Sequence, residues 1–167
     1  MKKIYLSFFL LLTGVAALAQ DTTAPVLNKS NRIILHFTDT TGKFTQLARL
    51  LIDRGYDIDM KDRELGILRT QPSPLRGASF WTDRVEIKTI FKDSTITFSG
   101  VYSYETYEHN LVRYEVFFSK KPDKDIMRSW EEMQTIAELL KPAFITYSTV
   151  DVTGKVQKVE SWYKRNN

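Results

Sequence analysis

The chain has 167 residues, with 24 basic and 20 acidic side chains, and contains no cysteine. This length fits one ordinary domain with its own hydrophobic core. The lack of cysteine excludes disulfides, thiol catalysis and thiolate metal sites, and an aromatic content of 13% supplies bulky side chains for packing.

The first 19 residues have the pattern of a secretory signal peptide. Lys2 and Lys3 give a positive start, residues 4–12 are nearly all apolar, and Ala17-Leu18-Ala19 is a small-residue cleavage site. The apolar run is shorter than the ~20 residues that a spanning helix needs. We therefore expect cleavage before Gln20, no transmembrane segment in the mature chain, and a periplasmic or secreted location.

Removal of residues 1–19 changes the charge balance. The mature chain of 148 residues keeps 22 basic and 20 acidic side chains, because only Lys2 and Lys3 are lost. A net charge of +2 gives no reason to expect nucleic acid as a partner. Residues 20–31 are predicted to form a polar leader, and residues 32–167 a single domain.

The first half of the domain is predicted to contain a strand, a helix and two further strands. Ile33, Leu35 and Phe37 alternate along one face of the first strand. Apolar residues then recur with helical spacing, and a glycine follows at the C-cap position: Phe44, Leu47, Ala48, Leu51 and Gly55. Alternation predicts a short half-buried strand at Tyr56, Ile58 and Met60, before a second strand over residues 67–70.

The second half is predicted to contain a hairpin, a strand and a helix. A loop over residues 71–82 precedes the hairpin, whose strands cover residues 85–91 and 96–104, and another strand covers 111–118. Asp123 or Asp125 can cap the helix, with a Ser129–Glu132 capping box as the alternative. The helix has an apolar stripe and ends at a proline: Ile126, Trp130, Met133, Ala137, Leu140 and Pro142. Residues 144–163 are predicted to add one or two strands around Thr153-Gly154.

This order predicts an α+β fold, an antiparallel sheet with two helices packed on one face. The other face of the sheet is expected to meet water, because its positions are mostly polar: Thr95, Thr97, Ser99, Ser103, Arg113 and Glu115.

Gly42-Lys43, placed between a strand and a helix, is the position of a phosphate-binding loop. The motif G-x-x-x-x-G-K-[ST] needs glycine at 37 and a hydroxyl residue at 44, but both positions are phenylalanine. The stretch is therefore interpreted as a helix start, with Asp39, Thr40 or Thr41 as the capping residue.

The two histidines do not predict a catalytic or metal site. Glu105 and His109 are four residues apart, but the flanking sequence is strand-like, so this spacing is not expected to converge on a metal. His36 is expected to be hydrogen-bonded within a strand. No catalytic, cofactor or metal residue is therefore assigned.

Exposed aromatic residues are the best candidates for a binding surface, because they offer large contact area at low entropic cost. Five of them are assigned to this surface: Phe80, Trp81, Tyr102, Tyr104 and Tyr107. In the alternative interpretation, Phe80 and Trp81 pack under the sheet and the tyrosines form cross-strand pairs.

Several local runs resemble small exported Bacteroidetes domains with a TATA-binding-protein-like fold. The resemblance covers residues 31–141 and rests on the signal ending before Gln20, Gly55-Tyr56, the run Gly66-Ile67-Leu68-Arg69-Thr70, the hairpin and the late helix. It implies a fold and an exported location, without a catalytic motif or DNA binding. A helix-grip fold shares much of this element order and is the structural alternative.

These features favour two functions, and an enzyme, which would require a cleft where His109 or His36 meets a carboxylate, is kept as a third alternative. The first is a non-catalytic envelope module that binds another protein or a glycan through an exposed face or loop. The second is a carrier of an apolar small molecule, in a cavity lined by Trp130, Met133 and Phe98.

Overall fold

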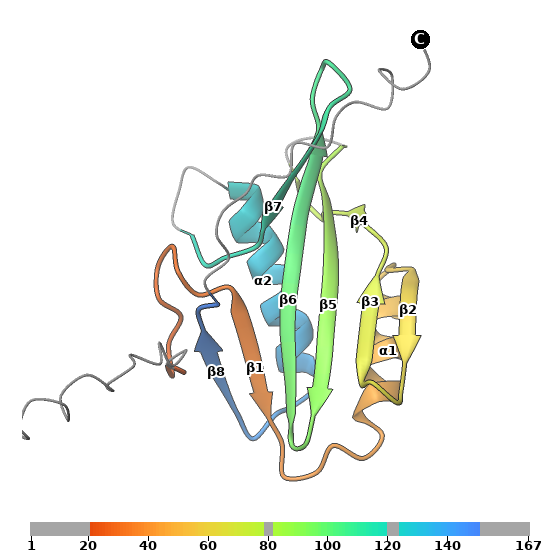
Figure 1. Cartoon of the computed structure of the whole chain (residues 1–167), viewed down its shortest axis with the longest axis vertical. Helices are drawn as coiled ribbons and strands as arrows, with labels where there is room; N and C mark the ends of the chain where they lie inside the picture. The colour runs from red at the N-terminus through yellow and green to blue at the C-terminus, as the bar shows by residue number, and fades with distance from the viewer. Residues whose placement is uncertain (1–20, 79–81, 120–123, 151–167) are drawn as a thin grey trace, which may run out of the picture.

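The computed structural model describes residues 21–78, 82–119 and 124–150, which form one antiparallel sheet and two helices (Figure 1). The α+β class predicted from the sequence is confirmed. The signal peptide, Phe80 and Trp81, Asp123 and the Thr153-Gly154 pair around which strands were predicted lie outside the described residues.

Eight strands make up the sheet: β1 (Arg32–His36), β2 (Ile58–Asp62), β3 (Ile67–Thr70), β4 (Ser73–Pro74), β5 (Arg84–Lys92), β6 (Thr95–Glu105), β7 (Leu111–Glu115) and β8 (Phe144–Ser148). The main path across the sheet is β2-β3-β5-β6-β1-β8, while β4 pairs with β5 and β7 pairs with β6. The β5–β6 hairpin is thus the centre of the sheet, and shorter strands flank it on both sides (Figure 1).

The predicted central hairpin forms because both of its strands alternate apolar and polar residues. Its register runs without interruption from Arg84↔Ser103 to Lys92↔Thr95, and Asp93 turns the chain with φ 51°. Val85, Ile87, Ile96 and Phe98 are fully buried on one face. A shift of one residue would expose this whole set, so burial fixes the register.

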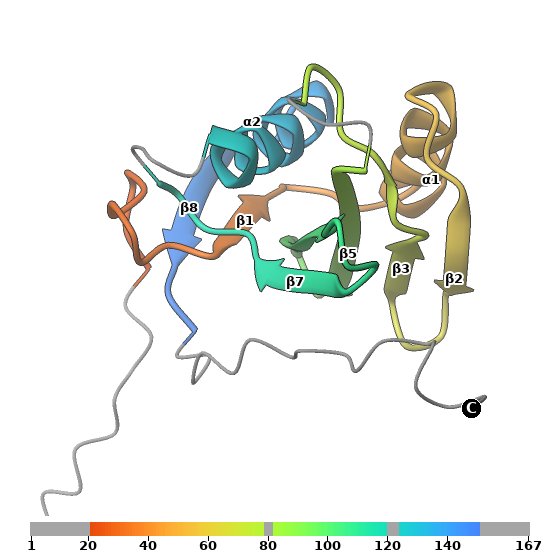
Figure 2. The ribbon, with the colours of Figure 1, turned by 90° about the horizontal axis from the view of Figure 1, so that it is seen from above.

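Both helices lie on the same side of the sheet (Figure 2). The first, α1 (Lys43–Asp53), packs near β2 and β3, and the second, α2 (Lys124–Leu139), packs on β6 and β1. Their buried side chains include most of the predicted apolar stripes: Leu47, Ala48 and Leu51 in α1, and Ile126, Trp130, Met133 and Ala137 in α2. Phe44 is half-buried, and the buried Leu140 follows the end of α2. Neither helix of the described part is long and apolar enough to cross a membrane.

Gly100 lets α2 approach the sheet closely. A Cβ atom at this position would lie 2.7 Å from Met133 Sδ and 3.1 Å from Val116 Cγ2. Met133 and Phe98 are fully buried, and Trp130 is 2% exposed. This direct contact between α2 and β6 disfavours a ligand cavity at Trp130, Met133 and Phe98, where a carrier would need one.

The first helix does not begin as predicted. Its N-cap is Gly42, with φ 75° and no side-chain hydrogen bond, so none of Asp39, Thr40 and Thr41 caps it. Asp39 Oδ1 instead accepts from the Thr41 backbone N–H at 2.8 Å, which makes a tight turn before the helix. Hydrogen bonds from the Thr41 side chain and backbone lower the pKa of Asp39. The N-cap position has a left-handed backbone conformation, which glycine adopts far more easily than serine, threonine or aspartate.

Three further details differ from the sequence prediction. Met60 is 40% exposed, because a bulge between Ile58 and Met60 shifts the register of β2. The Ser129–Glu132 capping box does not form, since Ser129 Oγ donates to the Asp125 carbonyl oxygen inside α2. Strand β7 ends at Glu115, three residues earlier than predicted.

The predicted polar leader is packed on the domain. The Thr22 backbone pairs with Tyr147 on the outer edge of β8, and Ser30 and Asn31 are buried. Asn31 Nδ2 donates to the Val150 carbonyl oxygen at 2.8 Å. The structural unit therefore begins before residue 32.

Candidate functional site

Within the residues that the structure describes, one face of the sheet carries no helix (Figure 2). We call it the outer face. Because side chains alternate along a strand, the residues that precede and follow each buried core residue point to this face. They include Arg32, Ile34, His36, Ile67, Arg69, Arg84, Glu86, Lys88, Ile90, Lys92, Thr95, Thr97, Ser99, Val101, Arg113, Glu115, Phe144 and Thr146. The polar character predicted for this face is confirmed, with three isoleucines, a valine and a phenylalanine as additions.

Isoleucine and threonine side chains form a row straight across the outer face. The strand register places five residues side by side: Thr146, Ile34, Thr97, Ile90 and Ile67. At the usual strand spacing this row is about 19 Å long. Ile90 is 40% exposed, and the other four are half-buried. The row combines branched aliphatic groups with hydroxyls on one strip of the outer face.

An aromatic pair borders this row at β1 and β8. The rings of His36 and Phe144 stack with centroids 4.2 Å apart, and His36 Nε2 lies 2.8 Å from Thr146 Oγ1. The expectation that His36 is hydrogen-bonded within a strand is confirmed. Phe144 is 57% exposed. Stacking therefore holds an exposed aromatic ring in a fixed orientation.

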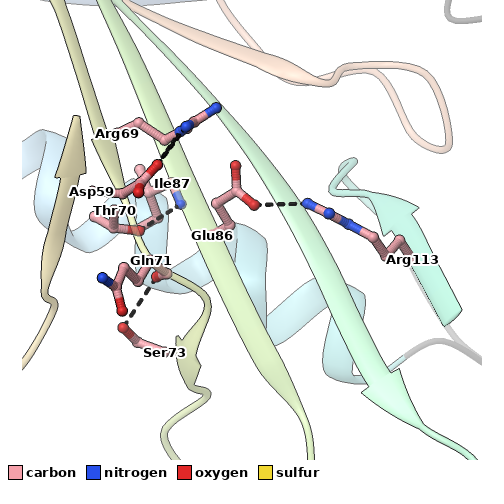
Figure 3. A network of polar contacts seen from close by, with 8 residues as sticks. All are labelled: Asp59, Arg69, Thr70, Gln71, Ser73, Glu86, Ile87 and Arg113. Carbon is pink, nitrogen blue, oxygen red and sulfur yellow. Dashed lines mark hydrogen bonds and ion pairs between the residues drawn. The ribbon is translucent and has the colours of Figure 1, made fainter. Parts of the chain in front are cut away.

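Three ion pairs fix arginine side chains on the outer face. Arg113 Nη2 lies 2.7 Å from Glu86 Oε2 and reaches across β6 to do so (Figure 3). Arg69 pairs with Asp59, also in Figure 3, and Arg32 pairs with Glu115. The carboxylates of these pairs are thereby neutralised.

Ser103 is the exception among the polar positions predicted to meet water. It is 4% exposed. Its cross-strand neighbours are Arg84 and Arg113, whose long side chains flank it. Arg113, directly opposite the serine on β7, is held over β6 by its ion pair with Glu86.

The tyrosines assigned to a binding surface do not act as one set. Tyr102 is 7% exposed, whereas Tyr107 is 99% exposed in the turn between β6 and β7. The half-buried Tyr104 stacks on Tyr114, with ring centroids 6.2 Å apart. The alternative of cross-strand tyrosine pairs holds for Tyr102 and Tyr114, which lie opposite each other. Of the three, Tyr107 alone is fully available to a partner.

Tyr102 belongs to a buried polar contact on the helix face. Its hydroxyl donates to Asp83 Oδ1 at 2.8 Å, and Asp83 is 2% exposed. Burial and this hydrogen bond raise the pKa of Tyr102. The contact joins β6 to the segment that leads into β5, so its evident role is structural.

His109 and Glu105, whose spacing was not expected to converge on a metal, pair with each other. Nδ1 of His109 lies 2.7 Å from Glu105 Oε1, because the chain reverses between β6 and β7 and His109 adopts φ 57°. Both side chains are exposed. No cluster of three or more His, Asp or Glu residues that could hold a metal occurs within the described ranges.

Lys43, the lysine of the rejected phosphate motif, is committed to the fold. Its Nζ donates to the Leu140 carbonyl oxygen at 2.9 Å and to Gln46 Oε1 at 3.1 Å. The ammonium also lies 5.1 Å from the Phe37 ring centroid. A cation at the end of α2 complements the helix dipole, so this lysine stabilises the packing of the helices.

No protein-family model and no curated protein matches this sequence. The side chains of the outer face are therefore the basis for proposing a function. Sequence reasoning found its polar positions from alternation but missed the Ile–Thr row, because that row depends on the register of five strands.

Proposed function

We propose that the protein is an exported, non-catalytic envelope module that binds a protein or a glycan through the outer face of its sheet. The observation that carries the proposal is the combination found on that face. The Ile–Thr row, the stacked ring of Phe144 and the ion-paired guanidinium group of Arg113 lie on strands of the same face. Rigid elements hold recognition groups more accurately than loops do.

The character of the face favours recognition over simple hydration. Ile90 and Phe144 are 40% and 57% exposed although the helix face offers a large core. Apolar groups rimmed by polar ones are typical of interaction sites. Tyr107, at the tip of the β6–β7 turn, offers a second contact point.

The proposal of a non-catalytic role rests on where the histidines lie. His36 is stacked and hydrogen-bonded in the sheet, and His109 is in an exposed turn. The proposed export rests on the signal-peptide pattern of residues 1–19. Intact mass of the protein from its own host tests export, with a chain that starts at Gln20 as the expected product.

Co-sedimentation with washed envelope particles tests the binding surface. Ile90→Gln removes an apolar group from the centre of the outer face and should abolish most sedimentation of the mature chain. Ile52→Gln is the matched control, because Ile52 is 58% exposed on α1. It should sediment like the wild type.

Circular dichroism of both variants establishes that they fold. Equal sedimentation of folded Ile90→Gln and wild type would contradict the proposed surface. Loss of sedimentation in Ile52→Gln alone would show that the binding site is on the helix side, and would contradict the proposed surface.

A further inference from the structure

Three cations form a line along the outer face of β5, the central strand. Arg84, Lys88 and Lys92 are all exposed, and none has an ion-pair partner in the part of the chain that the structure describes. Successive members are four residues apart, or about 13 Å along a strand. The line is therefore as long as the hairpin itself.

Each of these cations lies opposite a hydroxyl residue of β6. The register pairs Arg84 with Ser103, Lys88 with Ser99 and Lys92 with Thr95. Ser103 is buried, so the two accessible pairs are Lys88/Ser99 and Lys92/Thr95, with Ile90/Thr97 between them.

The two accessible hydroxyls keep their acceptor capacity. Thr95 Oγ1 donates to the Lys92 carbonyl oxygen at 2.8 Å, and Ser99 Oγ donates to that of Lys88 at 3.4 Å. A hydroxyl that donates its hydrogen still has oxygen lone pairs free. Each pair thus offers a positive charge and a hydrogen-bond acceptor side by side.

The carboxylates on the outer face do not cancel this line. Glu86 is paired with Arg113, Asp59 with Arg69 and Glu115 with Arg32. Asp62, at the far end of the row through Ile67 and Ile90, binds the Leu65 backbone N–H. The cations of β5 are left to attract an external anion.

We propose that the outer face binds a linear acidic polysaccharide along the β5–β6 hairpin; this inference rests on the proposed function. Carboxylates of the polymer contact Lys88 and Lys92, its hydroxyls donate to Ser99 and Thr95, and the apolar face of a sugar ring packs on Ile90. The spacing of charge, hydroxyl and aliphatic group along one straight line is the observation that favours a linear polymer.

An acidic protein segment fits this face less well. Strands β5 and β6 are already hydrogen-bonded on both sides, so an extended peptide has no free strand edge to pair with there. Its backbone groups would lose water without gaining partners. A polysaccharide has hydroxyl and carboxyl groups instead, which the serine, threonine and lysine side chains match.

Isothermal titration of the mature chain with polygalacturonate tests this inference. Binding should weaken as salt is raised, because exposed charge pairs are screened. Lys88→Gln with Lys92→Gln should weaken it by about tenfold. Arg49→Gln with Lys124→Gln removes the same charge from the helix layer and should leave the affinity within about twofold.

Neutral dextran and poly-glutamate are the comparison polymers. Equal affinity for poly-glutamate would overturn the preference for a glycan. Equal weakening of the affinity by both double variants would show that binding depends on overall charge, which would overturn the proposed site on the hairpin. If polygalacturonate does not bind while Ile90→Gln still loses envelope sedimentation, this inference fails and the proposed function stands. If neither effect is seen, both fail.

Discussion

Gly100 shows how a single residue sets the distance between two layers. It faces α2, and the nearest atoms to a Cβ at this position would belong to Met133 and Val116, both fully buried. Gly66 has a comparable constraint of another kind. Its φ is 65°, and a Cβ there would lie 2.6 Å from the Phe91 carbonyl oxygen. Both glycines are needed for space, one against α2 and the other against the backbone of β5.

Gly100→Ala should destabilise the protein by about 1–3 kcal/mol, because overpacking forces buried neighbours to move. Urea unfolding measures the change. Ser99→Ala is the control, since Ser99 points to the outer face, and should change the free energy of unfolding by no more than about 0.5 kcal/mol. Equal stability of Gly100→Ala and wild type would show that α2 is not in close contact with β6.

Tyr56 and Tyr102 should make the protein sensitive to alkali. Burial is the main cause that raises the pKa of each above the ordinary value of about 10. Below that value both residues are protonated whether the chain is folded or unfolded. As pH rises further, only the unfolded chain ionises, so the free energy of unfolding falls.

Tyr102→Phe should therefore be less stable at neutral pH by about 1 kcal/mol, through loss of the bond to Asp83, and should lose stability less steeply above about pH 10. Urea unfolding at several pH values measures both effects. Tyr107→Phe is the neutral-pH control, because its side chain is 99% exposed. A Tyr102→Phe variant with the wild-type slope would contradict this account.

At the scale of elements, a polar clamp joins the end of α1 to α2. Arg54 Nε and Nη2 donate to the two carboxylate oxygens of Glu132 at 3.0 and 2.8 Å, and the Tyr56 hydroxyl lies 3.3 Å from Glu132 Oε1. The side chains of Arg54 and Glu132 are 20% and 10% exposed. A paired, bidentate contact in this setting is stronger than an ordinary surface ion pair.

Glu132→Gln should cost about 1–2 kcal/mol of stability, because it leaves the Arg54 guanidinium without its counter-charge. Glu131→Gln is the matched control on the neighbouring, exposed position, and thermal unfolding compares the two. If both variants melt together with the wild type, the clamp does not contribute to stability.

The elements were predictable to the extent that local patterns determined them. Alternation gave the β5–β6 hairpin, and helical spacing gave the buried stripes of both helices. Met60 was misplaced because a bulge depends on the partner strand. The cap of α1 was wrong because Gly42 meets a backbone requirement that capping preferences do not include. Tyr102 was assigned to a binding surface, although it lies four residues after Phe98 and therefore shares the buried face of the strand.

At the scale of the whole molecule, the two faces of the sheet differ in their side chains. The face that both helices cover (Figure 2) holds the core, while the outer face combines cations, hydroxyls and exposed apolar groups. The edges of the sheet limit pairing with other chains. Charged residues and a bulge mark β2, and Thr22 covers part of β8. The TATA-binding-protein-like resemblance and the exported location remain predictions.

Methyl NMR of isoleucine-labelled mature chain tests the central claim, that the outer face is the binding surface. Ile34, Ile67 and Ile90 report on that face, Ile33 and Ile87 on the core, and Ile52 on the exposed side of α1. On addition of envelope polysaccharide or envelope protein, we predict that signals of Ile34, Ile67 and Ile90 shift while that of Ile52 does not. Shifts at Ile52 with an unchanged outer face, or no shifts with either fraction, would contradict the account.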